Sequence, residues 1–254
     1  MLKAIIFDVD DTLLDWEPRA QDWYEYEREH LRSVLDYVRQ EVYPLEDFEA
    51  FFADVQRRAD LAWTQAALDL HAPHMGRVLV AALEAAGVPP ERLDMEACLR
   101  AYDWRGMPGV TLYPDVVDTL VMLRGHGLRL GLVTNAYSPM WMRDEELRGL
   151  GLPVEWFDCR LSSADVGYLK PHPVIFRQAL DCLGVKPEEA VFIGDNLEAD
   201  IGGAQGMGMR AVLRVRHGAE AANGSPITPD AVIHSLHGLP ALLDAWYPGW
   251  QNGA

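Results

Sequence analysis

Acidic residues follow directly after two short apolar runs of the chain. Asp8 and Asp10 come after the apolar residues 4–7, and Asp195 comes after residues 190–194. In an open parallel sheet, ligands bind at the carboxyl ends of the strands, so these acids would converge at one edge. Three carboxylates repel one another unless a cation lies between them, and hard oxygen ligands favour Mg2+. The pattern predicts a magnesium site, although an Asp-x-Asp pair by itself is more often a strand-end turn.

Two further segments, and an acid that follows Asp195, would add polar groups to the same edge. Thr134 and Asn135 end another apolar run, Lys170 lies in a later loop, and Asp200 follows Asp195 by five residues. Each has an ordinary structural explanation, because a threonine can end a strand and most lysines are solvated at the surface. Such explanations account for one segment each, whereas a shared ligand site accounts for all four segments together.

Outside residues 17–107, short apolar runs alternate with helical patterns. The apolar runs predict strands at residues 2–7, 128–134, 159–161, 190–194, 211–215 and 231–233. Helices are predicted near residues 116–123, 173–183, 201–207 and 239–246. This alternation indicates an α/β fold, with a doubly wound parallel sheet similar to the Rossmann fold.

A block of helical patterns separates the first predicted strand from the second. Its apolar stripes predict helices over residues 23–42, 48–66, 78–86 and 90–104. The first strand has no neighbour of its own kind until after this block, so the simplest topology inserts the block into a loop. We predict an α/β core of residues 1–16 and 108–254, and an inserted all-α domain of residues 17–107.

Composition limits the partners and the compartment. The chain has 254 residues and a formal net charge of -17, which argues against a broad basic face for nucleic acid. No stretch approaches the roughly 18–20 apolar residues of a membrane helix, and the short run before Asp8 does not resemble a secretory signal. We therefore expect a cytoplasmic protein without a nucleic-acid or membrane partner.

The cysteines do not indicate a crosslinked or zinc-binding protein. Cys98, Cys159 and Cys182 are an odd number, without Cys-x-x-Cys or cysteine–histidine spacing. Neither a disulfide framework nor a structural zinc site is expected from this pattern, which agrees best with a reducing compartment.

Four segments resemble the sequence motifs of the haloacid dehalogenase (HAD) superfamily, whose members are mostly phosphohydrolases. They are FDVDDTL at residues 7–13, LVTN at 132–135, GYLKP at 167–171 and IGDNLEAD at 193–200. The resemblance covers the whole predicted α/β portion. The insertion after the first motif is similar to the helical caps that close over the substrate in this family.

The resemblance implies a role for each residue that acts on the phosphoryl group. Asp8 would be the nucleophile that forms an aspartyl-phosphate. Asp10 would protonate the leaving alcohol and then take a proton from the hydrolytic water. Thr134 and Lys170, assisted by Asn135, would bind the phosphoryl oxygens.

The same resemblance implies the metal ligands. Mg2+ would be held by the Asp8 side chain, the Asp10 backbone carbonyl and Asp195, and would neutralise the phosphate as anionic Asp8 approaches. Asp200 would be a supporting acid that orients Lys170 or the metal-bound waters.

These roles describe a Mg2+-dependent phosphatase that acts on a small phosphorylated metabolite. A phosphomutase on the same core, or a phosphometabolite-binding protein without turnover, stays open, as does the oligomeric state. Dehalogenation is disfavoured, because the dehalogenases that name the superfamily lack the second aspartate of the first motif, which is Asp10 here. A nicotinamide-linked enzyme is disfavoured because no GxGxxG follows the first strand.

Specificity is expected to reside in the insertion, where the pattern is least informative. Aromatic residues at helical spacing are more often core than ligand contacts, so we predict Trp23 to be core. Trp16 and Arg19, near the predicted hinge, are candidates for the substrate face. The charged run over residues 25–32 is predicted to be a solvated helix face, and residues 219–229 a surface loop.

Two residues beside the motifs have less specific interpretations. Asp11 stands where many relatives have glycine, and we expect it to cap the following turn. His172, after Lys170 and Pro171, is expected to be a solvated loop histidine rather than a residue at the substrate edge.

Overall fold

A six-stranded parallel sheet forms the centre of the computed structural model, which describes residues 1–20, 22–216 and 226–252. The strand order is β5-β4-β1-β6-β7-β8. The strands are β1 (Ala4–Phe7), β4 (Arg129–Thr134), β5 (Cys159–Ser162), β6 (Ala190–Gly194), β7 (Arg210–Arg214) and β8 (Ala231–Ile233). This arrangement confirms the predicted doubly wound α/β fold.

Alternate residues of each strand face opposite sides of the sheet, and both sides are covered by helices. Ile5 and Phe7 pack in one apolar cluster, with residues of α5 (Val116–Gly125), α6 (Met140–Gly149) and α10 (Leu239–Trp246). Ala4 and Ile6 pack in a second cluster, with residues of α8 (Pro173–Leu183) and α9 (Gly203–Gly206). Helices on both faces explain why these strands are continuous apolar runs in the sequence.

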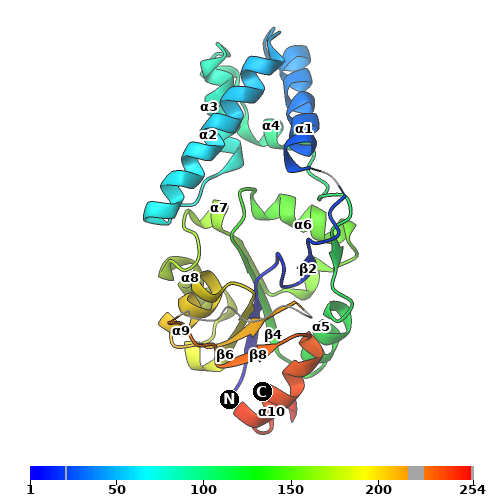
Figure 1. The fold of residues 1–254 in the computed structure, drawn as a ribbon, viewed down its shortest axis with the longest axis vertical. Coiled ribbons are helices and arrows are strands. Elements are labelled where there is room, and N and C mark those ends of the chain that lie inside the picture. Colours follow the sequence, from blue (N-terminus) through cyan, green and yellow to red (C-terminus); the bar gives the residue numbers. More distant parts are fainter. Residues whose placement is uncertain (21, 217–225, 253–254) are drawn as a thin grey trace.

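Four α-helices lie together at one end of the molecule, above the carboxyl edge of the sheet, and both termini lie at the other end (Figure 1). They are α1 (Trp23–Tyr37), α2 (Phe48–Asp69), α3 (Met75–Ala85) and α4 (Met95–Tyr102). We call this region the helical insertion. The π-helical segment Val38–Val42 extends α1, and a 3-10 turn at Pro90–Arg92 precedes α4. The predicted helix over 90–104 is therefore interrupted, because the Asp94 side chain caps a new helix start.

The two chain segments that join the insertion to the sheet are bonded to each other. β2 (Leu14–Asp15) pairs antiparallel with β3 (Thr111–Leu112), and the Ala20 N–H donates to the Pro108 carbonyl at 2.8 Å. The domain bounds at residues 16 and 108 stay a prediction, and the paired linkers lie beside them.

One helix of the core, α6, was not predicted. Its buried face includes Arg143, Asp144 and Glu146 together with apolar residues, so the sequence carries no clean apolar stripe. The single helix predicted near 201–207 is observed as two segments. A π-helical segment, Leu197–Gly202, comes first, and the short α9 follows it. The short helix α7 (Ser163–Val166) follows β5 directly and was likewise not predicted.

The expectation that no disulfide forms is wrong. Cys159 of β5 and Cys182 of α8 are bonded to each other, with their Cα atoms 5.9 Å apart, and Cys98 is free and buried. The pairing depends on α8 packing against β5, a contact between elements that cysteine spacing alone does not report.

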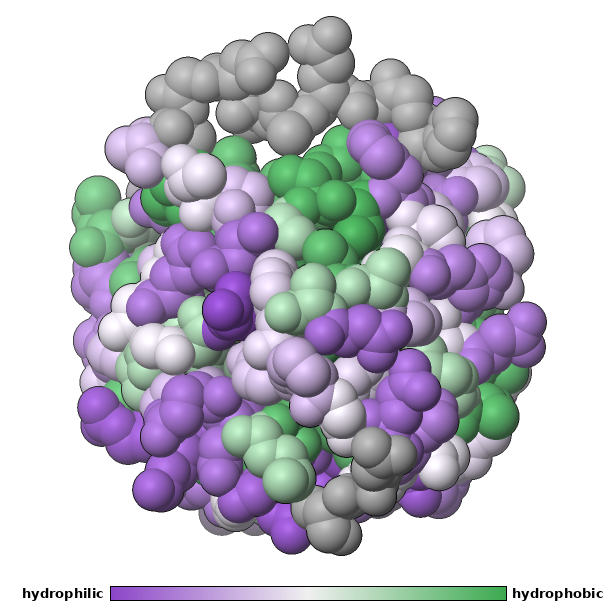
Figure 2. Space-filling model, turned by 90° about the horizontal axis from the view of Figure 1, so that it is seen from below, coloured by the Kyte–Doolittle hydropathy of each residue, from purple (hydrophilic) through white to green (hydrophobic). Residues whose placement is uncertain are grey.

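Within the described residues, no helix is long and apolar enough to cross a membrane. Hydrophilic residues cover much of the end of the molecule opposite the insertion, with smaller groups of hydrophobic residues among them (Figure 2). Residues 219–225 of the predicted surface loop at 219–229 lie outside the described residues.

Candidate active site

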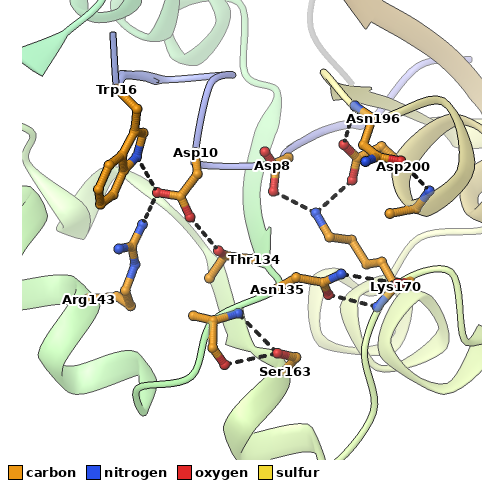
Figure 3. Close-up of polar contacts among 12 residues, drawn as sticks. Asp8, Asp10, Trp16, Thr134, Asn135, Arg143, Ser163, Lys170, Asn196 and Asp200 are labelled. Carbon is orange, nitrogen blue, oxygen red and sulfur yellow. Dashed lines mark hydrogen bonds and ion pairs between the residues drawn. The ribbon is translucent and has the colours of Figure 1, made fainter. Parts of the chain in front are cut away.

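Polar side chains from four chain segments meet at the carboxyl edge of the sheet, beneath the helical insertion (Figures 1 and 3). Asp8 follows β1, and its N–H continues the ladder by donating to the Ile193 carbonyl of β6 at 2.9 Å. Thr134 is the last residue of β4, and Asp195 follows the last residue of β6. Parallel pairing of β1 with β4 and β6 therefore brings these groups together, as the sequence predicts.

Lys170 is the centre of a buried ion-pair network. Its ammonium nitrogen lies 2.6 Å from Oδ1 of Asp8 and 2.6 Å from Oδ1 of Asp200. Burial lowers the pKa of Lys170, but the two carboxylates overcome this effect and hold it above its ordinary value. Lys170 is therefore a fixed positive charge beside Asp8.

Asp200 is held against the end of β6 by tight packing. Its Oδ2 accepts the Asn196 N–H at 3.0 Å. A Cβ at position 194 would collide with the Asp200 carboxylate, so only glycine fits there. The Gly-Asp pair at residues 194–195 therefore has a packing reason as well as a chemical one.

Three carboxylates at this edge form a possible metal site. One oxygen from each of Asp8, Asp195 and Asp200 lies within 4.8 Å of the others. Burial, reinforced by neighbouring acids and opposed by Lys170, raises the pKa of Asp8 to about 8. Desolvation and the charge of Asp200 raise the pKa of Asp195 to about 7. An all-oxygen donor set with excess negative charge fits a hard divalent cation such as Mg2+.

Asp10 points away from Asp8 and toward a different set of partners (Figure 3). Its Oδ1 accepts from the Arg143 guanidinium at 2.6 Å and from the Trp16 indole N–H at 2.8 Å. Its Oδ2 accepts from the Thr134 hydroxyl at 3.3 Å. The turn after β1 directs the Asp10 side chain away from the Asp8 side chain. The two carboxylates therefore do not share a hydrogen-bond partner.

Arg143, on the unpredicted helix α6, extends this contact into a chain of buried groups. Its second guanidinium nitrogen lies 2.6 Å from Glu146, whose Oε2 also accepts from the Trp104 indole N–H at 3.0 Å. Burial lowers the pKa of Arg143, whereas Asp10 and Glu146 raise it above its usual range. No motif in the sequence identifies Arg143, because its partner Asp10 lies 133 residues away in the chain.

Asn135 uses its side chain to fix the loop that carries Lys170. Its Oδ1 accepts the Lys170 N–H at 2.7 Å, and its Nδ2 donates to the Lys170 carbonyl at 3.0 Å. Ser163 similarly bonds both backbone groups of Ala136, at 3.0 Å each. The Asn135 amide is therefore committed to backbone groups, and contact of residue 135 with a phosphoryl group stays a prediction.

The helical insertion also reaches the Lys170 loop. Leu169 donates its N–H to the Leu70 carbonyl at 2.8 Å, and Ala72 donates its N–H to the Gly167 carbonyl at 3.0 Å. The rings of His71 and Tyr168 lie 4.8 Å apart. This short antiparallel contact connects the end of α2 to the loop that positions the lysine.

A cavity of about 340 Å³ separates Asp10 from the insertion. Residues of the helical insertion and of the α/β core line this cavity. They are Asp10, Trp16, Trp23, Glu27, Gln56, Ala59, Asp60, Trp63, Met75, Trp104, Asn135, Ala136, Tyr137, Ser138 and Arg143. The prediction that Trp23 is core is wrong, since it is 44% exposed and lines this cavity. Trp16 also lines it, whereas Arg19 is exposed and is not among the lining residues.

Glu27 was missed because it lies in the charged run over residues 25–32. The charged residues Glu25, Glu29 and Arg32 of that run are exposed, but Glu27 is only 5% exposed and lines the cavity. Burial raises its pKa, although the Gln56 amide, 2.6 Å from Oε2, and the Trp23 side chain act in the opposite direction. The run is therefore a solvated face with one buried acid in it.

Asp11 and His172 both have structural roles. Asp11 adopts a left-handed conformation (φ 56°) and lies 3.1 Å from the Arg216 guanidinium. His172 caps α8, its Nδ1 accepting the Val174 N–H at 3.3 Å, and stacks on Tyr168 with ring centroids 4.0 Å apart. His172 is thus a partnered helix cap and not the solvated loop residue that was expected.

Curated relatives match most of the chain. A glyceraldehyde 3-phosphate phosphatase of Methanopyrus kandleri is 34% identical over 219 residues, which cover 86% of this chain and 85% of the relative. A phosphoserine phosphatase of Thermus thermophilus is 33% identical over 239 residues, covering 83% of this chain and 88% of the relative. Both relatives are phosphatases of small metabolites.

A solved structure and a family model agree with these similarities. The crystal structure of a 2-haloacid dehalogenase from Pseudomonas syringae pv. Tomato DC3000 has a TM-score of 0.62 and 30% identity, covering 97% of this chain and 100% of that chain. The model of haloacid dehalogenase-like hydrolases matches residues 2–208, which include all four motifs. The chain belongs to the haloacid dehalogenase-like hydrolases.

Proposed function

We propose that the protein is a Mg2+-dependent phosphatase that hydrolyses a small phosphorylated metabolite through an aspartyl-phosphate on Asp8. The observation that carries this proposal is that the two acids of the first motif have different surroundings. Asp8 contacts the buried Lys170 ammonium, and Asp10 lines the cavity. The phosphatases of Methanopyrus kandleri and Thermus thermophilus support the same reaction class.

In the first step, a carboxylate oxygen of Asp8 attacks phosphorus and the bond to the ester oxygen breaks. The leaving alkoxide takes a proton from Asp10 and departs as an alcohol toward the cavity. In the second step, water attacks the phosphorus of the aspartyl-phosphate while Asp10 takes its proton. Phosphate leaves, Asp8 is again a carboxylate, and Asp10 again carries the proton with which it entered the first step.

The chain's own groups would stabilise the charge that the phosphoryl oxygens carry. Lys170 supplies a buried positive charge, and the Thr134 hydroxyl lies next to Asp10 at the same edge. Mg2+ held by the carboxylates of Asp8 and Asp195 and the Asp10 backbone carbonyl would supply further positive charge to the phosphate. Asp200 would hold Lys170 in place, in agreement with their 2.6 Å contact.

We further propose that residues 17–107 act as a cap domain over a core of residues 1–16 and 108–254. The cavity between the insertion and Asp10 supports this division, because a closed cap would exclude water during transfer. Linkers near Trp16 and Pro108 would let the cap open for product release.

Dehalogenation is a second candidate, because the Pseudomonas syringae dehalogenase is 30% identical. It would need no proton donor for its leaving group, since halide departs as the free anion. Asp10, fixed beside the cavity by Arg143 and Trp16, supports an alcohol leaving group instead.

A panel assay tests the proposal. Phosphate release is measured from sugar phosphates, nucleotides, phosphoglycolate and 4-nitrophenyl phosphate, with Mg2+ and with excess chelator, for the wild type and Asp8→Asn. Halide release from a 2-haloacid is measured in parallel. Phosphate release that requires both Mg2+ and Asp8 is expected, and halide release without phosphate release would reject the phosphatase.

A further inference from the structure

We propose that the cavity selects phosphate esters whose leaving alcohol is ring-sized, uncharged or cationic, and rich in hydrogen-bond donors, and that it rejects leaving groups with a second carboxylate or phosphate. This inference rests on the proposed phosphatase activity and names its substrate class. It follows from the charge, the hydrogen-bonding groups and the shape of the part of the cavity that lies beyond Asp10.

The charges that line the cavity are mostly negative. The insertion contributes Glu27 from α1 and Asp60 from α2. Among the described lining residues the one arginine or lysine is Arg143, and its guanidinium is already paired with Asp10 and Glu146 at 2.6 Å each. An anionic leaving group would therefore face two carboxylates with no free counter-charge, which disfavours its binding.

Apart from the indole N–H groups of its tryptophans, the insertion contributes mainly acceptors to the cavity. The Glu27 carboxyl group lines the cavity, and it is oriented by the Gln56 amide nitrogen, which donates to its Oε2 at 2.6 Å. This contact leaves the Gln56 carbonyl oxygen, another acceptor, for other partners. A ligand with hydroxyl, amine or ring N–H groups could donate hydrogen bonds to these acceptors.

The shape of the cavity favours a flat or cyclic group. Aromatic rings make up much of the lining, from Trp16, Trp23, Trp63, Trp104 and Tyr137. The volume of about 340 Å³ is at the lower end of small-molecule sites, which suits one ring and not an extended chain. Trp23 is 44% exposed and Trp63 is 39% exposed, so these rings are not core residues. Trp23 lies 5.6 Å from the Trp104 ring and Trp63 lies 6.3 Å from the Tyr137 ring, both tilted, so the exposed part of each ring is what a ligand would contact.

The test compares three hexose-derived esters of nearly equal size, with sorbitol 6-phosphate as the neutral, open-chain control for 6-phosphogluconate. Glucosamine 6-phosphate has a cationic leaving group, glucose 6-phosphate a neutral one, and 6-phosphogluconate an anionic one. We expect kcat/KM with Mg2+ to be about tenfold or more lower for 6-phosphogluconate than for the other two, because unpaired like charges discriminate strongly. 4-Nitrophenyl phosphate, whose turnover does not depend on sugar recognition, is assayed beside them.

Variants that remove one negative charge show which residues cause the preference against 6-phosphogluconate. Glu27→Gln and the exposed-site variant Asp60→Asn should each reduce the preference several-fold and raise turnover of 6-phosphogluconate. Glu29→Gln, an exposed position on the same helix, changes the net charge equally and should leave the preference unchanged. Because Asp60 is exposed, its variant is expected to fold even where Glu27→Gln does not.

Binding measured without turnover separates this inference from the proposed function. Quenching of tryptophan fluorescence is titrated with glucosamine and with gluconate, and we expect quenching by glucosamine that Asp60→Asn weakens. If no ester releases phosphate but this quenching pattern is observed, the proposed phosphatase activity is rejected. The preference of the cavity for uncharged or cationic groups over anionic groups is then supported. Turnover of all three esters at equal kcat/KM, unchanged in both variants, would overturn the inference and leave the phosphatase standing.

Discussion

The Arg143 guanidinium of α6 lies 2.6 Å from the Asp10 carboxylate of the loop after β1, although 133 residues separate them. The opposite end of Arg143 is held by Glu146, which is fully buried. This contact fixes the proposed proton-transfer carboxylate from outside the four sequence motifs. It also connects Asp10, through Glu146 and Trp104, to the segment that leaves the helical insertion.

Replacing Arg143 by Gln should reduce kcat by about 10- to 100-fold, a part of the effect that a positioned acid–base group supplies. The KM for 4-nitrophenyl phosphate should change little, since Arg143 holds Asp10 and not the phosphate. Removing the cation from a buried network should also lower the free energy of unfolding by about 3–5 kcal/mol. Steady-state kinetics and urea unfolding measure both effects.

Two further variants make the Arg143 prediction specific. Arg143→Lys keeps the charge and should recover part of kcat. Arg148→Gln removes an arginine from the same helix whose ion pair with Glu155 is exposed, and it should leave kcat unchanged. Equal kcat values for wild type and Arg143→Gln would show that Asp10 needs no such support.

Asp8→Asn should abolish phosphate release without unfolding the protein. The amide has no nucleophilic carboxylate, but it has nearly the same shape as the acid and its oxygen can still accept a hydrogen bond from Lys170. Lys170 keeps Asp200 as a partner at 2.6 Å. Circular dichroism should match the wild type, and substantial remaining turnover would reject Asp8 as the nucleophile.

Mg2+ should stabilise the wild-type protein, because it would neutralise carboxylates whose ligand oxygens lie within 4.8 Å of one another. At about 100 times its dissociation constant, the ion would add about 2.7 kcal/mol to the free energy of unfolding. Thermal melting with Mg2+ and with chelator measures this shift. Asp195→Asn should lose most of it, and Asp158→Asn, away from the cluster, should keep it.

Gly109→Ala should disturb the linkers between the insertion and the sheet. Gly109 has a φ of +90°, and an added Cβ would clash with the Pro18 carbonyl and lie 2.8 Å from the Ala20 nitrogen. We expect a loss of about 1–3 kcal/mol in the free energy of unfolding, together with a lower kcat/KM. Gly125→Ala, where no atom lies within 4 Å of the added Cβ, is the control and should keep kcat/KM while raising the free energy of unfolding by at most about 1 kcal/mol.

His30 should make the insertion less stable in mild acid. Burial lowers its pKa below the ordinary value of 6.5, although the Tyr102 carbonyl, 2.6 Å from Nδ1, acts in the opposite direction. The unfolded chain therefore binds this proton more tightly than the folded one. The neutral ring contributes stability above about pH 6.5, and that contribution is lost as the pH falls through the lower folded pKa.

Urea unfolding between pH 7.5 and 5 tests this effect. His30→Gln, which keeps an N–H donor for the Tyr102 carbonyl, should show a smaller loss of stability over this range than the wild type. His237→Gln alters an exposed histidine and should follow the wild-type curve. Identical pH dependence in His30→Gln and wild type would contradict the prediction.

The sequence by itself determined the elements whose signal is local. A strand buried on both faces must be apolar throughout, and for this reason β6 was predicted with its observed bounds. Local apolar patterns also predicted β8, α8 and α10 with their observed bounds. The convergence of Asp8, Thr134 and Asp195 also followed from the sequence, because parallel strands place their carboxyl ends at one edge.

Only the tertiary structure decided which side chains those groups would meet. Arg143 and Glu27 are charged residues that long-range partners allow to be buried, so composition and periodicity predicted no site at either position. Trp23 lies at helical spacing yet faces a cavity, and Cys159 pairs with Cys182 because α8 packs against β5. Each depends on packing between segments far apart in the chain, which no local pattern encodes.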